Sequence, residues 1–206
     1  MTAKTKTIPV WPAIAVLLVL TLVAALGWSY YQNRYPSWYE EVRLSDGRII
    51  TIHQKREHYD NYGTNQSWVT MDLPELGGKR VWHSYLMPQR VDVVDGKVYV
   101  FGAPRGDRQY AHYRFPKHYM VGFLWSGNEF SRIPFLDVPA RLRVEENVYP
   151  CIPRITSKKI SIGEKSENWC PPEGDSMQFT KVIDLVAYQA LAARYSRRSG
   201  GAPISD

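Results

Sequence analysis

Histidines are the residues of this 206-residue chain most suited to metal binding or acid–base catalysis. His53 and His58 are five positions apart, which on a strand places them on opposite faces. His83 stands alone, and a proline separates His112 from His118. The HxH, HxxxH and HExxH spacings that bring two imidazoles to one ion do not occur. The sequence therefore predicts no local metal site and no cofactor, although a site assembled from distant strands stays open.

Gly174-Asp175-Ser176 is the segment closest to a nucleophile motif. It is similar to the GDS block of lipase-type esterases, in which the Ser follows a buried strand early in an α/β domain. Here it follows two prolines, late in a β-rich chain, and helix capping explains it better. The GxSxG, P-loop and GxGxxG motifs do not occur. The sequence predicts no catalytic residues and favours a non-enzymatic protein.

Two cysteines, Cys151 and Cys170, are each followed closely by proline. In an oxidising compartment an even number of cysteines predicts one disulfide. It would close a loop of about 20 residues and contribute roughly 3 kcal/mol in the chain-entropy model. The alternatives are two buried thiols or a pair of metal ligands.

Aromatic rings next to hydrogen-bonding and cationic groups are typical of glycan-stacking surfaces and of protein-binding hot spots. Two segments, around residue 60 and at 110–119, have this mixture. The candidate partner-binding residues in them are Tyr59, Tyr62, Tyr110, His112, Tyr113, Arg114, His118 and Tyr119. The alternative is that alternate rings fill a small β-core.

The longest apolar stretch lies at residues 8–28 and contains no charged side chain. As a helix it would measure about 31 Å, close to the thickness of the hydrocarbon core of a bilayer. The expected membrane-interface residues at its ends are Trp11, Trp28, Tyr30 and Tyr31. The sequence therefore predicts a single transmembrane helix. The alternative is a cleaved signal peptide ending near Ala25-Leu26-Gly27.

The charge distribution predicts the orientation of this helix. Lys4 and Lys6 precede it without an acidic neighbour, whereas basic and acidic residues nearly cancel just after it. The positive-inside rule then places the N-terminus in the cytoplasm and the C-terminal domain on the periplasmic or extracellular side of the inner (plasma) membrane. Of the 26 Lys and Arg residues, 24 follow residue 31 together with all 20 acidic residues. This mild excess argues against a nucleic-acid partner.

The rest of the chain reads as β-structure. Turn signals at Asp46-Gly47, Asp95-Gly96 and Ser126-Gly127-Asn128 predict hairpins, and about eight strands are expected at regular spacing. We interpret 58–66 as a polar loop and 110–115 as a strand. The pattern predicts a mainly β fold, an antiparallel β-sandwich or open barrel with one C-terminal amphipathic helix packed on it. The expected domains are a cytoplasmic tip and anchor at 1–31, a juxtamembrane spacer at 32–37, the β-rich domain at 38–198 and a tail at 199–206.

The C-terminal helix is expected at 176–197, capped by Asp175 and Gln178. Its buried face would consist of apolar side chains at helical spacing. They are Phe179, Val182, Ile183, Val186, Ala190 and Ala193.

These features favour a membrane-anchored interaction module that binds another envelope protein, for example an accessory or immunity-type factor. The alternative is a protein that binds or hydrolyses cell-wall material or glycans. A hydrolase needs two facing carboxylates in an aromatic groove. The candidates are Asp60, Asp72, Asp92, Glu145 and Glu146.

Overall fold

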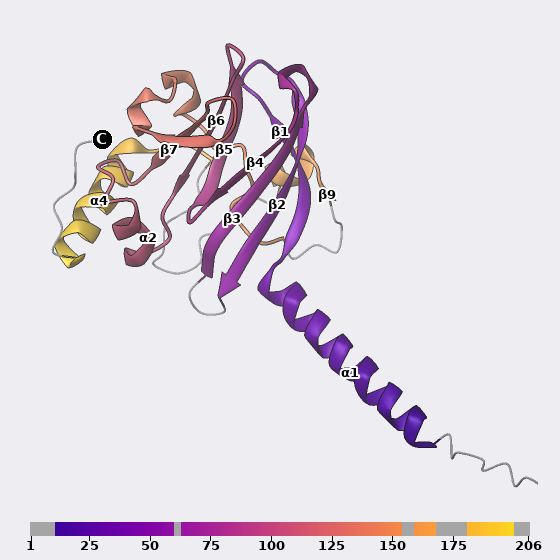
Figure 1. Ribbon diagram of the computed structural model, residues 1–206. Coiled ribbons are helices and arrows are strands. Elements are labelled where there is room, and N and C mark those ends of the chain that lie inside the picture. The colour runs from indigo at the N-terminus through magenta and orange to yellow at the C-terminus, as the bar shows by residue number, and fades with distance from the viewer. Residues whose placement is uncertain (1–10, 60–62, 154–158, 168–180, 200–206) are drawn as a thin grey trace, which may run out of the picture.

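The computed structural model describes residues 11–59, 63–153, 159–167 and 181–199 (Figure 1). The protein is mainly β, with two sheets, an apolar helix near the N-terminus and a helix near the C-terminus. The elements in chain order are α1 (Trp11–Arg34), β1 (Ser37–Arg43), β2 (Ile49–Tyr59), β3 (Gly63–Leu73), η2 (Pro74–Leu76), β4 (Gly78–Ser84), β5 (Met87–Val94), β6 (Lys97–Ala103), α2 (Asp107–His112), β7 (Val121–Trp125), β8 (Phe130–Ile133), η3 (Phe135–Asp137), η4 (Ala140–Leu142), β9 (Lys159–Ile160), α3 (Ile162–Glu167) and α4 (Leu185–Ser199).

The strands form a five-stranded sheet with the order β4-β3-β2-β1-β9 and a four-stranded sheet with the order β5-β6-β7-β8. Neighbouring strands are antiparallel, as expected, except that β9 pairs in parallel with β1. The three predicted hairpins are confirmed. Their turns place Gly47, Gly96 and Gly127 at φ of 89°, 70° and 101°, a region that favours glycine.

Both sheets contribute side chains to one hydrophobic core. Ile52, Val69 and Trp82 come from the five-stranded sheet, and Val100 and Phe123 come from the four-stranded sheet. Buried and exposed side chains alternate in β4, because Trp82 is buried while its neighbours Val81 and His83 are exposed. The five-stranded sheet therefore has one face toward the core and one face toward solvent.

A second buried cluster lies where α4 covers the four-stranded sheet. It contains Tyr110, Tyr119, Phe135 and Tyr188, and Figure 1 shows α2 and α4 together on this side of the domain. The helix α1 leaves the domain beside β1 and β2. In the part of the chain that is described, it is the one helix long and apolar enough to cross a membrane, and none of its residues is buried.

The predicted start and face of the C-terminal helix are wrong. Residues 181–184 are not helical, because Val182 forms a β-bridge with Glu145. The helix begins at Leu185, and the Asp184 carboxylate caps it by accepting bonds from the backbone N–H groups of Val186 (2.9 Å) and Ala187 (3.0 Å). Residues 176–180, with Phe179, lie outside the described residues.

The side chains that α4 buries differ from the expected set. Tyr188, Ala192 and Ser196 are buried, whereas Val186 is 76% exposed and Ala190 and Ala193 face solvent.

Two other local predictions are wrong. The expected strand at 110–115 overlaps the end of α2, which packs near α4. The expected polar loop at 58–66 is largely strand, because β2 continues to Tyr59 and β3 begins at Gly63.

Candidate functional site

The helix α1 joins the five-stranded sheet almost without a linker. It ends at Arg34 and β1 begins at Ser37, so the spacer expected at 32–37 is mostly regular structure. The Arg34 guanidinium forms an ion pair with Glu57 (Nη2 to Oε1, 2.8 Å) and donates to the carbonyl of His58 (3.4 Å). The end of α1 is therefore bonded to β2.

Glu57 is the central acceptor of this joint. Its carboxylate also accepts bonds from the side-chain amides of Asn65 (2.7 Å) and Gln66 (2.8 Å) in β3. Burial alone would raise the pKa of Glu57, but the bonds from Asn65, Gln66 and Arg34 outweigh it and lower that pKa. The joint thus holds a carboxylate in its charged form.

Lys55 lies beside this joint in a box of aromatic rings. Its ammonium is 5.7, 4.8 and 5.1 Å from the ring centroids of Tyr31, Tyr35 and Trp68, and it donates to the Tyr31 hydroxyl (3.3 Å). Cation–π contact explains why the ammonium stays among the rings. We call Tyr31, Tyr35, Lys55 and Trp68 the junction cluster.

Ring contacts continue from this cluster across the solvent-facing side of the sheet. Trp68 stacks on His83 (centroids 4.8 Å apart, planes 6° apart), and Tyr85 lies 6.2 Å from His83 and 4.8 Å from His112. At the other end, Trp28 stacks on Tyr31 at 6.1 Å. We call this series the aromatic strip. It consists of Trp28, Tyr31, Tyr35, Trp68, His83, Tyr85 and His112.

Strand register explains why residues so far apart in the chain meet here. Opposed residues of neighbouring strands point to the same face of a sheet. One row across the sheet is Ser37, Lys55, Trp68 and His83, and the next is Tyr39, His53, Thr70 and Val81. Neither row contains a carboxylate.

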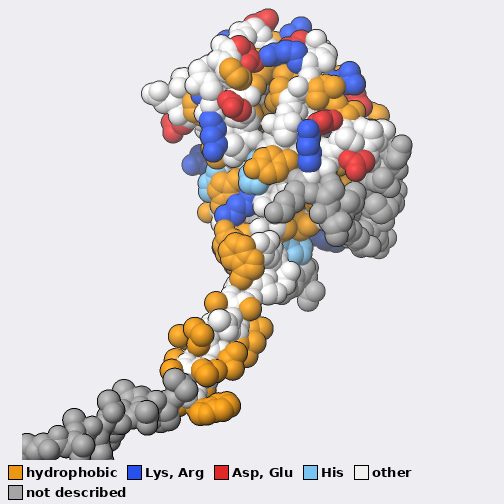
Figure 2. All heavy atoms as spheres, turned by 90° about the vertical axis from the view of Figure 1, so that its right-hand side faces the viewer, with side chains coloured by type: hydrophobic (Ala, Val, Ile, Leu, Met, Phe, Trp, Pro, Cys, Tyr) orange, Lys and Arg blue, Asp and Glu red, His pale blue; other side chains and the backbone are white. Residues whose placement is uncertain are grey.

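Lys55 is the charged side chain within the row that contains Trp68 and His83. Burial, with the charges of Lys79 and Lys55, lowers the pKa of His53, and burial lowers the pKa of His83. Both imidazoles are therefore neutral at pH 7. Figure 2 shows the described part of α1 as a stalk of hydrophobic side chains, below a domain surface on which hydrophobic, basic and acidic groups are mixed.

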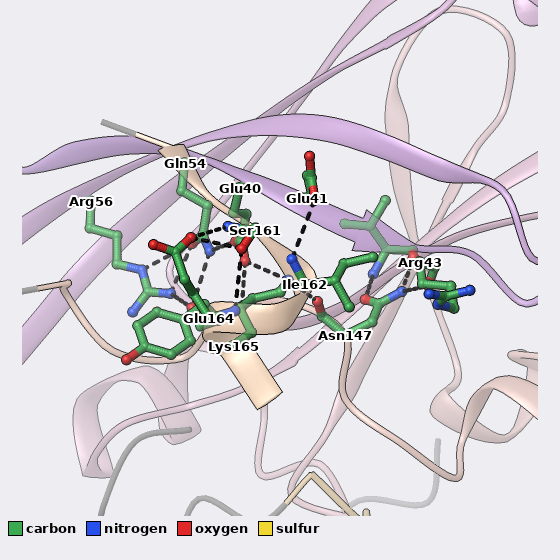
Figure 3. A network of polar contacts seen from close by, with 12 residues as sticks. Glu40, Glu41, Arg43, Gln54, Arg56, Asn147, Ser161, Ile162, Glu164 and Lys165 are labelled. Atoms are coloured by element: carbon green, nitrogen blue, oxygen red, sulfur yellow. Dashed lines mark hydrogen bonds and ion pairs between the residues drawn. The ribbon is translucent and has the colours of Figure 1, made fainter. Parts of the chain in front are cut away.

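A second network of polar side chains, centred on Glu40, is buried and has a structural role. The Glu40 carboxylate in β1 is fully buried and accepts bonds from the ammonium of Lys165 (2.8 Å), the N–H of Tyr149 (2.9 Å) and the amide of Gln54 (Figure 3). Arg56 donates to the carbonyls of Tyr149 (2.7 Å) and Pro150, and burial lowers its pKa to about 9. These bonds hold Tyr149, Pro150 and Lys165 of α3 against the sheet.

A cavity of about 300 Å³ lies beside this network. Its lining includes basic and acidic side chains and contains no tryptophan. The lining residues are Arg43, Leu44, Ser45, Arg90, Glu145, Glu146, Asn147, Ile162, Lys165, Ser166 and Lys181. Glu146 is buried, and this burial raises its pKa to about 8, although Tyr188 and Gln89 bond to it.

The residues predicted to bind a partner do not form one exposed surface. Tyr110, Tyr113, His118 and Tyr119 are buried. The Tyr110 hydroxyl, for example, donates to the carbonyl of Ala192 (3.1 Å) in α4. His112 and Arg114 are exposed. The side chain of Tyr59 and the whole of Tyr62 lie outside the described residues.

The other candidate residues have different surroundings. Trp11, Trp28, Tyr30 and Tyr31 are all exposed on α1, and Tyr31 and Trp28 belong to the aromatic strip. Cys151 is half-buried against the small cluster that contains Trp38 and Ile160. Cys170 lies outside the described residues, so the disulfide stays a prediction.

The candidate carboxylates that the structure describes do not face one another across an aromatic groove. Asp92 is fully buried and accepts bonds from Arg90 (2.7 Å) and from the N–H of Ser45 (3.1 Å). Asp72 is exposed, and Asp60 lies outside the described residues. Glu145 is exposed at the cavity, next to buried Glu146. No group of three or more His, Cys, Asp or Glu side chains suited to a metal ion occurs within the described ranges.

Comparison of the chain with protein-family models, with curated proteins and with solved structures finds no match. The proposals below therefore rest on the geometry and chemistry of the chain itself.

Proposed function

We propose that the protein is a non-enzymatic interaction module, a β-sandwich held at the outer face of an inner membrane by α1, that binds another envelope protein. The observation that carries this proposal is the aromatic strip, which continues from the end of an apolar helix across the open face of a sheet. The N-terminus would lie in the cytoplasm and the β-rich domain in the periplasm.

The anchor is supported by burial and by residue type. All described residues of α1 are unburied, which an apolar helix in water would not tolerate without a covering surface. Trp11 lies at one end of this helix and Trp28 and Tyr30 at the other, as in the aromatic belts of membrane proteins. A bilayer is the covering surface that fits this length and pattern.

The strip fits a protein partner better than a glycan. A glycan hydrolase needs a groove with rings and two carboxylates. Here the rings lie on an open sheet face, whereas the cavity near Glu145 and Glu146 has no tryptophan in its lining. Tyr and Trp side chains, with polar edges and large apolar area, are typical of protein-binding hot spots. On the sheet face the strip offers exposed Tyr85 and half-buried Trp68.

Site-specific photocrosslinking in intact cells tests the proposal. A photoreactive phenylalanine analogue replaces Tyr85 in the strip or, as the control, exposed Ser131 in β8. We expect a discrete crosslinked protein partner at Tyr85 and none at Ser131, with equal amounts of both variants in the membrane fraction. Equal crosslinking at both positions, or none at Tyr85 when the variant is present in the membrane, would refute the proposal.

A further inference from the structure

We propose that the junction cluster binds the phosphate of a lipid headgroup, so that the helix end of the aromatic strip rests on the bilayer in which α1 is anchored. This inference rests on the proposed membrane anchor. It adds a ligand, a lipid phosphate, and a named cation, Lys55, that receives it.

Helix geometry places the cluster at the correct height. The apolar stretch ends at Trp28, and Tyr31 lies three residues further along α1, or about 4.5 Å at 1.5 Å per residue. The headgroup layer of each leaflet is about 5–7 Å thick, from the difference between the whole bilayer and its hydrocarbon core. Because the Lys55 ammonium bonds to the Tyr31 hydroxyl, it lies next to a side chain of this layer when α1 spans the membrane.

The charges around Lys55 fit an anion. Among the described residues no carboxylate contacts its ammonium, whereas the neighbouring cation Arg34 is paired with Glu57. An ammonium has three N–H donors, and Tyr31 accepts from only one of them. A phosphate oxygen at the open side of the ring box would receive the others and neutralise the charge.

The joint prevents the cluster from turning away from the bilayer. Only Tyr35 and Pro36 separate α1 from β1, and both are bonded: Tyr35 donates its N–H to the Tyr31 carbonyl (2.8 Å), and the Pro36 carbonyl accepts from the N–H of Arg56 (3.0 Å). With the Arg34–Glu57 pair, these bonds make helix and sheet one unit. A flexible tether would allow Lys55 to move away from the bilayer surface, whereas this joint keeps Lys55 at a fixed position relative to α1.

Solid-state NMR of the full chain in bilayers tests the inference. The probe is a phosphatidylcholine membrane with or without phosphatidylglycerol, in phosphate-free buffer, so that lipid is the only source of phosphorus. Isotopically labelled lysine ammonium groups report proximity to phosphorus through dipolar dephasing. Lys55→Gln is compared with Lys79→Gln, an exposed lysine further along the same face of the sheet.

We expect dephasing in the wild-type chain that is reduced in Lys55→Gln and unchanged in Lys79→Gln, with a larger Lys55-dependent part in the anionic membrane. Alkaline carbonate extraction of the same samples separates the two proposals. Retention in the membrane without any Lys55-dependent dephasing would overturn the inference alone. Release of the wild-type chain by carbonate would overturn the anchor and the inference together.

Discussion

Removal of the Lys165 ammonium is expected to destabilise the protein strongly. Lys165 and Glu40 form a buried ion pair at 2.8 Å, in which the Lys165 side chain is 6% exposed and the Glu40 side chain is not exposed. Lys165→Met leaves the buried Glu40 carboxylate without its hydrogen-bonded countercharge, because the buried Arg56 guanidinium attracts Glu40 but bonds to Gln54, Tyr149 and Pro150. Breaking a buried pair on one side costs about 3–5 kcal/mol, because the remaining charge cannot be solvated. The N–H of Tyr149 still bonds to Glu40 but supplies no full charge.

A matched control is available at the next residue of β1. Lys159 pairs with Glu41 at 3.0 Å, but the two side chains are 54% and 27% exposed. Lys159→Met should therefore cost about 0–1 kcal/mol, since water replaces the lost partner. The double variant Glu40→Gln/Lys165→Met removes both buried charges and should recover most of the loss.

Urea unfolding of the full chain in detergent micelles, followed by tryptophan fluorescence, measures these differences. Trp38 is buried near this network and reports on its loss. Equal shifts of the midpoint for Lys165→Met and Lys159→Met would show that the Glu40 carboxylate does not depend on Lys165. The reasoning would then be refuted, as it would be if the double variant were less stable than Lys165→Met alone.

Three further predictions concern stability. Burial raises the pKa of Glu146 to about 8, so the folded state holds a proton that the unfolded state releases near pH 4.5. The free energy of unfolding should therefore fall as the pH rises between these values, by up to about 1.4 kcal/mol per pH unit. Urea midpoints measured from pH 5 to 8 should fall less in Glu146→Gln than in the wild type, and parallel profiles would contradict this. A Cβ at Gly102 would collide with the Met87 carbonyl, whereas Gly163 has ordinary space around it. Gly102→Ala should therefore destabilise the fold by at least about 1–3 kcal/mol, and Gly163→Ala should stabilise it by up to about 1 kcal/mol. Equal melting temperatures of the two variants would argue against this packing. Asp184→Ala removes the cap of α4 and should destabilise the protein by about 1 kcal/mol. We expect faster amide hydrogen exchange confined to the first turn of α4. Unchanged exchange there would show that the cap is dispensable.

The hairpins could be predicted because their signals are local. Asp95-Gly96 joins two runs of alternating apolar residues, and the turn needs positive φ at both positions, 52° and 70°. The apolar stretch that becomes α1 is likewise visible without any tertiary information. Each of these features depends on neighbours within a few residues.

The C-terminal region could not be predicted in the same way. Ile183 donates its N–H to the carbonyl of Val144 (2.9 Å), and Val182 bridges to Glu145, so a distant segment takes the residues before the helix out of the helical pattern. The local capping signal at Asp175 depends only on neighbouring residues and carries no information about the distant segment at 144–145. Tertiary pairing overrides propensity here.

The aromatic strip also could not be predicted from the sequence alone. Trp28 and Tyr31 are recognisable as interface residues, and the alternation in β4 places His83 on a solvent face. Their connection through Trp68 requires the register of β3 against β4, in which Trp68 opposes His83. That register is set by the packed sheet and not by any short motif.

A topology reporter at the C-terminus tests the central claim most directly. The full chain is fused after Asp206 either to a fluorescent protein that matures only in the cytoplasm or to an alkaline phosphatase that is active only outside it. A membrane anchor with a periplasmic β-rich domain predicts an active phosphatase and a dark fluorescent fusion, both in the membrane fraction. A bright fluorescent fusion of full length with an inactive phosphatase would contradict the account.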